Sequence, residues 1–502
     1  MAATSLPLRE PQSNAGLTLG LAALVALGAA MGVGLVFGEL ESLWVSLAII
    51  ACIAVLYDFR AGAVMAILLL PLSESSVFPH ALFGITGLNP FNLLLAASLA
   101  SFLLHGRVKA AGAFVPKPLL WLYIVPLVLA GLMGSRHAEE IAPVLYDNMA
   151  IHFLDAPGYL RDVVFKPMLT VLTALLIGAA VARSKKPERF LVAIGFSIAA
   201  ICLLSIWYVV RSGMSLQELA DVHSREFFAG IGMHSNSLGR LCAVGYAMLL
   251  FGWAESRDRA FRLACLAGMA LVVVALTLTF SRGAFVGFFI VNALFFLWRF
   301  NAKTAALVLL AGVAVIVAAP EQVFERISMG FETGDLNEIS AGRIDTIWLP
   351  VLPEIWKSPL IGQGLGSTMW SDAMRHGLML EVTHPHNAYL EALLDVGVVG
   401  LGILLAYFWH VWKQFRALGS NAFLTPEMRG FYQGSAAGLL SFLVTGFAGS
   451  SLAPLPETAF LWMAIGMMYG QLARRPATSE ERVAPQAGRL AGRSVPSAGV
   501  GG

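Results

Sequence analysis

The fold class follows from residues 263–298, which read LACLAGMALVVVALTLTFSRGAFVGFFIVNALFFLW. One charged residue, Arg282, interrupts this apolar stretch. A helix needs about 20 apolar residues to cross the hydrocarbon core of a bilayer, and somewhat fewer can suffice. The stretch is therefore long enough for two crossings, divided at Ser281-Arg282-Gly283. It predicts a helical hairpin whose turn lies at a membrane surface.

The rest of the chain has the same character. Of its 502 residues 58% are apolar and 13% are charged, and the mean hydropathy is +0.75, whereas soluble domains carry roughly 25% charged residues. The net charge of +2 is too small to suggest a nucleic-acid-binding surface. The cysteines stand in apolar runs without paired spacing, which favours small buried hydrophobes over a disulfide framework or a CxxC metal site. They are Cys52, Cys202, Cys242 and Cys265.

Fourteen apolar runs are candidate membrane spans. In chain order they are Leu17–Phe37, Ser42–Tyr57, Ala61–Leu72, Phe91–Leu104, Leu119–Met133, Val163–Ala182, Phe190–Val210, Leu238–Ala254, Leu263–Phe280, Ala284–Trp298, Ala305–Ala319, Ala388–Trp412, Phe431–Phe447 and Thr458–Ala473. The sequence thus predicts an all-α polytopic membrane protein with about 12–14 transmembrane helices. The weakest candidate is Ala61–Leu72, a short run close to several prolines, for which a re-entrant segment is the alternative.

Lys and Arg in short loops predict the orientation, because they collect on the cytoplasmic side. Five connections are basic, at residues 107–117, 183–189, 257–262, 299–303 and 413–429. With fourteen spans all five fall on one side together with both termini, and that side is predicted to be the cytoplasm. The opposite side is predicted to be the periplasm of a Gram-negative bacterium.

This arrangement divides the chain into five parts. They are a cytoplasmic N-terminus (1–16), transmembrane helices with short loops (17–319), one long periplasmic loop between the late helices (320–387), C-terminal transmembrane helices (388–473) and a cytoplasmic tail (474–502). The tail is rich in Ala, Gly, Pro and Arg, and we expect it to be disordered. No cleavable signal peptide is evident, so we take the first apolar run as a span.

Polar groups near membrane depth are costly and are therefore functional candidates. Ser281 and Arg282 form the first pair. One interpretation is a hairpin turn with an arginine that snorkels to the surface. The other is an arginine at the outer mouth of a cavity, where its planar fork can bind a phosphate group. Composition alone leaves both open.

The long outer loop carries Gly342-Arg343-Ile344-Asp345, the glycine string at Gly362–Ser367, and His384-Pro385-His386-Asn387. The string lacks the G-K-[ST] ending of a nucleotide loop, so we expect a Gly-rich turn. An H-x-H pair without a third ligand is a weak metal signal, and we predict no metal. His386 precedes a helix at the membrane boundary, where a neutral imidazole can take a proton from a hydroxyl group. A capping or interfacial histidine is the alternative.

A segment before the run at Leu238 holds Arg225 and His234. We expect Asn236 or Ser235 in it to be the N-cap of the following helix. Arg161 lies beside Asp162 and Lys166, for which a surface ion group is the alternative to ligand binding.

Arginines on the outer face run against the positive-inside bias. An anionic ligand in the outer leaflet, such as a lipid pyrophosphate, would explain Arg161, Arg225, Arg282 and Arg343 together.

Four motifs in this order resemble the O-antigen ligase and polymerase superfamily. They are SRGA at Ser281–Ala284, GRID at 342–345 followed by Trp348, PLIGQGLGS at Pro359–Ser367 and HPHNAYLEALLDVGVVGL at His384–Leu401. This superfamily consists of bacterial integral-membrane glycosyltransferases that use undecaprenyl-pyrophosphate-linked glycans. The resemblance covers residues 224–401 and is most specific in the HN block after the long loop. It implies a GT-C-like helical fold in the inner membrane, with the active site facing the periplasm.

The resemblance also implies the residues of the site. His386 is the implied catalytic base, and arginines of the outer face are the implied ligands of the donor diphosphate. The substrate-binding set is Arg282, Arg343, Arg225, Arg161, His384, Asn387, Ser281 and His234. No cofactor and no metal are implied.

The implied activity is that of an O-antigen ligase, an inverting glycosyltransferase that moves a glycan from undecaprenyl pyrophosphate to lipid A–core. The alternatives within the superfamily are a polymerase that extends the glycan and a protein O-oligosaccharyltransferase. A transporter is an alternative of another class. It would place charged residues or broken helices at mid-bilayer, whereas the candidates here collect at one interface.

Overall fold

The computed structural model describes residues 40–75, 78–82, 85–106, 114–148, 151, 153, 155–220, 222–299, 324, 334–449 and 451–474. Within these residues the strands are β1 (Ala81–Leu82) and β2 (Ile85–Thr86), paired antiparallel. Six helical segments are long and apolar enough to cross a membrane: Lys117–Glu140, Ala156–Arg183, Pro187–Ser212, Ser235–Glu255, Arg259–Leu278 and Ala388–Gly419. The predicted fold class, an all-α polytopic membrane protein, is confirmed.

The helices follow the predicted apolar runs. They are α2 (Leu40–Tyr57), α3 (Phe59–Leu69), α4 (Pro90–Ser101), α6 (Val125–Gly134), α9 (Lys166–Arg183), α10 (Phe190–Ser212), α12 (Ser235–Glu255), α13 (Arg259–Leu278), α14 (Arg282–Trp298), α20 (Ala388–Gly419), α21 (Pro426–Thr445) and α22 (Ala459–Leu472). The runs Leu17–Phe37 and Ala305–Ala319 lie outside the described residues. The predicted division at Ser281–Gly283 is confirmed, because α13 ends at Leu278 and α14 begins at Arg282.

The bundle is built around α12, whose neighbours are α10, α13, α14 and α21. Glycines let two of these backbones approach closely. A Cβ atom added to Gly434 of α21 would lie 2.4 Å from the carbonyl oxygen of Ala247 in α12. Small residues at such contacts are characteristic of membrane helices, since lipid gives apolar side chains little reason to cluster and close packing has to supply the attraction.

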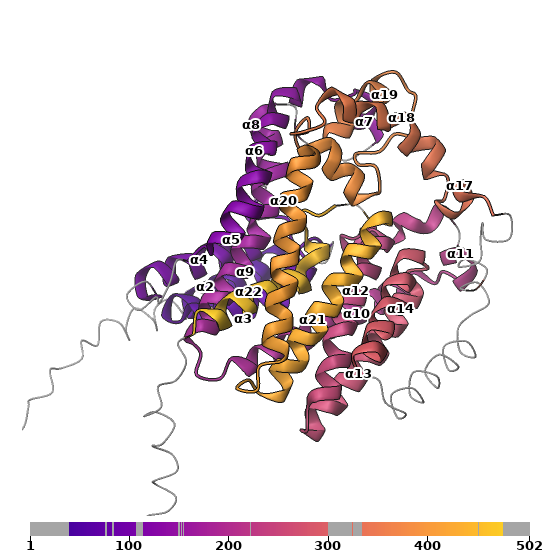
Figure 1. Cartoon of the computed structure of the whole chain (residues 1–502). Helices are drawn as coiled ribbons and strands as arrows, with labels where there is room; N and C mark the ends of the chain where they lie inside the picture. The colour runs from indigo at the N-terminus through magenta and orange to yellow at the C-terminus, as the bar shows by residue number, and fades with distance from the viewer. Residues whose placement is uncertain are drawn as a thin grey trace, which may run out of the picture.

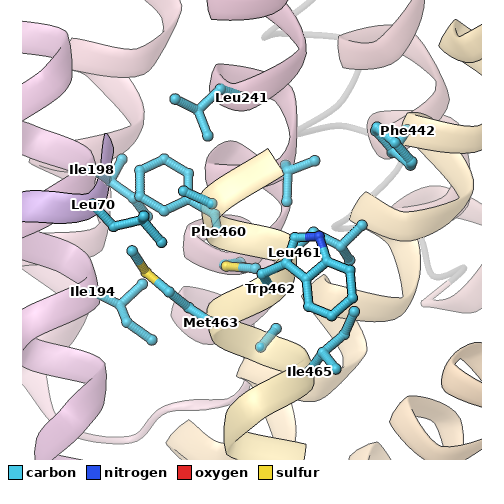
Figure 2. Packing of buried hydrophobic residues seen from close by; sticks show 14 of the residues in the cluster. Leu70, Ile194, Ile198, Leu241, Phe442, Phe460, Leu461, Trp462, Met463 and Ile465 are labelled. Carbon is cyan, nitrogen blue, oxygen red and sulfur yellow. The ribbon is translucent and has the colours of Figure 1, made fainter. Parts of the chain in front are cut away.

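The last helix of the described residues, α22, also lies inside this bundle. α22 packs along α9. Figure 2 shows Phe460 and Met463 of α22 against Ile194 and Ile198 of α10, beside Leu70. All five side chains are buried. The last helix is therefore part of the core.

The basic helix ends gather at one end of the bundle, the lower end in Figure 1. Arg299, after α14, contacts Glu255 at the end of α12 and donates a hydrogen bond of 2.5 Å to Gln433 of α21. Arg429 donates to the same glutamate at 3.2 Å. Arg474, after α22, donates to the carbonyl oxygen of Val181 at 3.0 Å. These contacts join the ends of five helices.

Residues 334–387, here called the insertion, cover the opposite end (Figure 1). Their short helical segments are α17 (Leu336–Ile339), η9 (Ile344–Trp348), α18 (Leu349–Val351), η10 (Leu352–Lys357), η11 (Ser367–Trp370) and α19 (Asp372–Arg375). Trp370 and Met374 share a second hydrophobic core with Ile141, Leu145 and Tyr159. The segment between α6 and α9 and the insertion therefore pack together as one cap.

The glycine string locks this cap to the bundle at a break in α20. Gly397 has φ 68° and ψ −175°. The N–H groups of Val398 and Val399 donate to the carbonyl oxygens of Pro359 (2.9 Å) and Leu360 (3.1 Å). The carbonyl groups of Leu394 and Asp395, which an unbroken helix would pair with those N–H groups, accept from Gln363 (2.8 Å) and Gly364 (2.9 Å). The predicted Gly-rich turn is therefore confirmed, and four hydrogen bonds join it to α20.

The break predicts a sharp difference between two glycines of α20. Gly397 occupies a region of φ and ψ that is essentially restricted to glycine, and a Cβ atom there would lie 2.4 Å from the Leu360 backbone. Gly402 has no atom within 4 Å of such a Cβ. We expect Gly397→Ala to lower the melting temperature in detergent by several degrees and Gly402→Ala to leave it unchanged or slightly higher. Equal effects of the two substitutions would contradict this account of the break.

Candidate active site

A cavity of about 1330 Å³, here called the large cavity, lies where the insertion meets the bundle. Its walls come from α9 and the turn before it, from α12, from α20 and from residues 448–457, closed by the end of the insertion. The charged side chains and histidines of its wall include Arg161, Lys166, His234, Arg240, His384, His386, Glu391, Asp395 and Glu457. Pockets for small molecules usually measure about 300–1,000 Å³, so the large cavity has room for a bulkier ligand.

His386 lies in this wall directly before α20. The side chain of Asn387 caps the helix by accepting hydrogen bonds from the N–H groups of Tyr389 (3.1 Å) and Leu390 (3.2 Å). On the other side, the indole N–H of Trp348 donates to the carbonyl oxygen of Pro385 at 2.9 Å. His386 itself has a φ of 51°. The predicted helix start after His386 is confirmed, and bonds on both sides fix the histidine's backbone.

The large cavity brings three predicted histidines together. The ring centroids of His384 and His386 are 4.3 Å apart, and those of His234 and His386 are 6.4 Å apart. His234 is the N-cap of α12, because its Nδ1 accepts a hydrogen bond of 3.1 Å from the N–H of Asn236. The predicted cap, Asn236 or Ser235, is therefore wrong. The imidazole occupies the capping position, and the Asn236 side chain is engaged elsewhere.

Burial keeps the His384 imidazole neutral. It lowers the pKa of His384 to about 4, against an opposing effect from the Glu457 carboxylate. Positive charge on His234, Arg240 and Arg343 lowers this pKa further. In the part of the chain that the structure describes, no three His, Cys, Asp or Glu side chains converge as metal ligands. The chemistry available to the histidine pair is therefore proton transfer and hydrogen bonding.

A second, smaller pocket of about 360 Å³ holds Arg282 and Arg343. It adjoins the large cavity, since Asn236 and Ala448 line both. Arg343 donates a hydrogen bond of 3.4 Å to the carbonyl oxygen of Ala448. Ser281 caps α14 and donates from its hydroxyl group to Asn236 at 2.7 Å. The predicted residues Ser281, Arg282 and Arg343 thus come together beside the histidines.

The arginine pocket is also bounded by apolar side chains on the outside of the bundle. Val286 and Phe289 of α14 are 47% and 55% exposed, and Phe447, after α21, is 60% exposed. In a chain that spans a bilayer, such side chains face lipid. The pocket therefore places two cations next to an apolar, lipid-facing surface.

Two of the predicted arginines do not join this pair. Arg161 lies in the wall of the large cavity, where it forms an ion pair with Asp162 at 2.9 Å, and Lys166 binds the same carboxylate at 2.8 Å. This matches the surface ion group that was the alternative interpretation. Arg225 falls within η8 (Val222–Ile231), and its side chain lies outside the described residues.

Charged residues inside the predicted spans complete the cavity wall, and sequence reasoning missed them. Arg240 of α12 forms a buried ion pair with Glu457. Glu391 and Asp395 lie one turn apart on α20. A signal for them existed, because ionisable residues inside apolar runs are functional candidates by default. The candidate residues predicted from the sequence lie in the predicted loops and turns instead.

The comparisons with known proteins agree with the motifs. A family model described as O-antigen ligase matches residues 267–405. A protein of Rickettsia conorii with the name "Putative polysaccharide ligase" is 27% identical over 189 residues, which cover 34% of this chain and 44% of the relative. A protein of Rickettsia felis with the same name is 26% identical over 189 residues, covering 34% and 45%. The match thus spans less than half the length of these relatives. Residues 267–405 are similar to the O-antigen ligase family, and the resemblance to that superfamily is confirmed.

The buried His384 predicts a pH dependence of stability. Its pKa is about 4 in the folded protein and about 6.5 in an unfolded chain, so the unfolded state binds more protons between these values. Stability is then fully present above pH 6.5 and falls as the pH drops towards 4. We expect His384→Gln to remove this contribution, so that its melting temperature falls less than the wild-type value between pH 7.5 and pH 5. The control is His376→Gln, at an exposed histidine of the insertion. Parallel curves for wild type and His384→Gln would contradict the assignment.

Proposed function

We propose that this protein is an O-antigen ligase, which transfers a glycan from undecaprenyl pyrophosphate to lipid A–core at the periplasmic face of the bacterial inner membrane. The observation that carries the proposal is the junction of two cavities at Asn236 and Ala448. One is a lipid-facing pocket with two arginines, and the other is a large cavity in which His234, His384 and His386 lie together. The match to the ligase family supports the same reaction.

The donor occupies the arginine pocket. A diphosphate ester of a polyprenol needs cations for its charge and an apolar surface for its chain, and the pocket offers both. Arg282 and Arg343 bind the diphosphate through forked hydrogen bonds. The polyprenyl chain leaves the pocket past Val286 and Phe289 into the bilayer. The same arginines stabilise the diphosphate as it departs.

The acceptor sugar occupies the large cavity, where His386 acts as the general base. His386 takes the proton from the attacking hydroxyl group, whose oxygen bonds to the anomeric carbon of the donor glycan. The bond from that carbon to the diphosphate oxygen breaks, and the bonding electron pair leaves with undecaprenyl diphosphate. Attack from the side opposite the diphosphate inverts the configuration. The proton on His386 then passes to the diphosphate or to water, and no metal takes part.

The periplasmic location rests on the distribution of charge. The basic helix ends lie at the end of the bundle away from both cavities, and positive loops favour the cytoplasm. A transporter is disfavoured, because the charged residues gather below the insertion rather than between two halves of the bundle. A polymerase and a protein O-oligosaccharyltransferase would use the same donor chemistry and differ in the acceptor.

The surface carbohydrate of a deletion strain distinguishes these acceptors. Loss of a ligase leaves core lipid without O-chain, together with polymerised glycan on its lipid carrier. Loss of a polymerase leaves core bearing a single repeat unit. A deletion strain with intact O-chain on its core and an altered protein glycan would exclude both the ligase and the polymerase and would identify a protein O-oligosaccharyltransferase. We expect the first result.

The proposed roles also predict that two substitutions fail in different ways. His386→Ala should lower turnover by about 10²–10⁴-fold, the usual contribution of a general base, and should leave donor binding largely intact. Arg282→Lys keeps the charge but loses the fork, so donor binding itself should weaken, as it should for Arg343→Ala. His384→Ala should be milder than His386→Ala. Transfer and donor binding are measured in detergent, at matched protein level.

Arg375→Lys is the control for these variants, since Arg375 lies on the outside of the insertion and pairs with Glu140. Wild-type transfer by His386→Ala would exclude the histidine as base. Loss of donor binding in that variant, as complete as in Arg282→Lys, would move the base to another side chain of the large cavity, with His234 first.

A further inference from the structure

Glu391 is a carboxylic side chain in the wall of the large cavity for which the reaction described so far has no use. Its Oε2 atom is buried and finds no hydrogen-bond partner among the described residues. The Ser451 hydroxyl group hydrogen-bonds the carboxyl group. A buried polar atom without a partner lowers stability, because its desolvation is not compensated by a hydrogen bond. A residue retained at such a cost calls for an explanation.

Three other carboxylates of the cavity wall, those of Asp395, Glu457 and Asp162, are committed within the protein. Asp395 accepts hydrogen bonds from the N–H groups of Gly366 and Ser367, each at 3.0 Å, and from the Ser367 hydroxyl group at 2.7 Å. Glu457 forms the ion pair with Arg240. Asp162 binds Arg161 and Lys166. Glu391 has no cation within salt-bridge distance among the described residues, so it differs from all three.

Its position on α20 relates it to the base. Ala388, Glu391, Ala392 and Asp395 follow the 3.6-residue repeat of one helix face, and all of them line the large cavity. Glu391 is three residues along from Ala388, which corresponds to a rise of about 4.5 Å. His386 lies just before the start of that stripe.

We propose that Glu391 recognises a hydroxyl group of the acceptor sugar that His386 deprotonates, and so helps to determine which acceptor is used. Sugars present several hydroxyl groups, and a carboxyl group accepts hydrogen bonds from them. The terminal torsion of a glutamate is soft, so the side chain can turn either oxygen towards the cavity. The inference rests on the proposed transfer reaction, because that reaction identifies the ligand as an acceptor sugar. The unpaired Oε2 atom of Glu391 is an observation on the protein itself.

The first arm of the test measures binding and transfer with a lipid A–core acceptor and with acceptors that lack one hydroxyl group of the terminal sugar. Glu391→Ala should weaken acceptor binding by roughly 2- to 10-fold, the range for one hydrogen bond between neutral groups, while donor binding stays at the wild-type level. One deoxy acceptor should bind wild type as weakly as the full acceptor binds the variant. The two losses should not add, because they remove the same bond. Glu391→Gln, which keeps a hydrogen-bonding group, should lose less.

The second arm measures melting temperature without substrate. Glu391→Gln and Glu391→Met should melt at or above the wild-type temperature, because they remove a carboxyl group that is poorly paired in the empty site. Asp395→Asn, the matched control one turn along the same face, should melt lower, because it disturbs three hydrogen bonds to the insertion.

The outcomes separate the two hypotheses. If wild type transfers no glycan to lipid A–core but binds the acceptor in a manner that depends on Glu391, the proposed function fails and the recognition stands. The inference is overturned if the loss of acceptor binding in Glu391→Ala adds to the loss for every deoxy acceptor. It is also overturned if Glu391→Met melts well below wild type with unchanged acceptor binding, because Glu391 is then a structural residue.

Discussion

The site depends on one exchange of hydrogen bonds, in which α20 gives up two of its own and takes four from the insertion. The backbone groups freed at Gly397 lie near the membrane, where an unpaired N–H or C=O group is costly. The segment from Pro359 to Gly364 satisfies all four of them. The Asp395 carboxylate adds three more bonds to Gly366 and Ser367. The first turns of α20 are therefore held in place by the insertion, and the position of His386 follows, since it directly precedes that helix.

Two consequences follow for the two cavities. The insertion contributes Arg343 to the pocket next to lipid and His384 and His386 to the large cavity. Because the same segment supplies residues to both, the distance between the proposed diphosphate site and the proposed base is fixed by the fold. In the proposed reaction, donor and acceptor would reach that junction from different directions, one from the bilayer and one through the large cavity. Orientation of this kind lowers the entropic cost of bringing two reactants together.

The sequence predicts most of the fold and about half of the site, and the division has a physical reason. The apolar runs that fall on described residues, the Ser281 turn, the Gly-rich turn and the start of α20 are local features, and these appear as expected. Other features depend on which faces of distant helices pack together, and local sequence patterns do not predict this packing. They include the partners of Asp395, the Arg240–Glu457 pair and the orientation of Glu391. Arg161 shows that shared sidedness does not imply a shared pocket. Its side of the membrane suggested a common site with Arg282, but its nearest partners are Asp162 and, through it, Lys166. The capping role of His234 was also unexpected, since an imidazole is an unusual substitute for Ser or Asn at that position.

Backbone strain gives independent support for the division into two cavities. Three non-glycine residues of the described part of the chain have positive φ, namely Phe280 (46°), Ala341 (61°) and His386 (51°). Phe280 lies two residues before Arg282, Ala341 lies two residues before Arg343, and the third is the proposed base. Left-handed conformations cost such residues about 1–2 kcal/mol each, and they persist where the surroundings impose them, most often at functional sites. Chain connectivity alone does not require positive φ angles at a hairpin turn, a loop and a helix start. A site that brings two guanidinium groups and an imidazole to one junction does require special backbone conformations, because the backbone direction next to each residue sets where its side chain lies. The strain therefore falls on the proposed base and within two residues of each of the two arginines, and this observation uses neither charge nor motif.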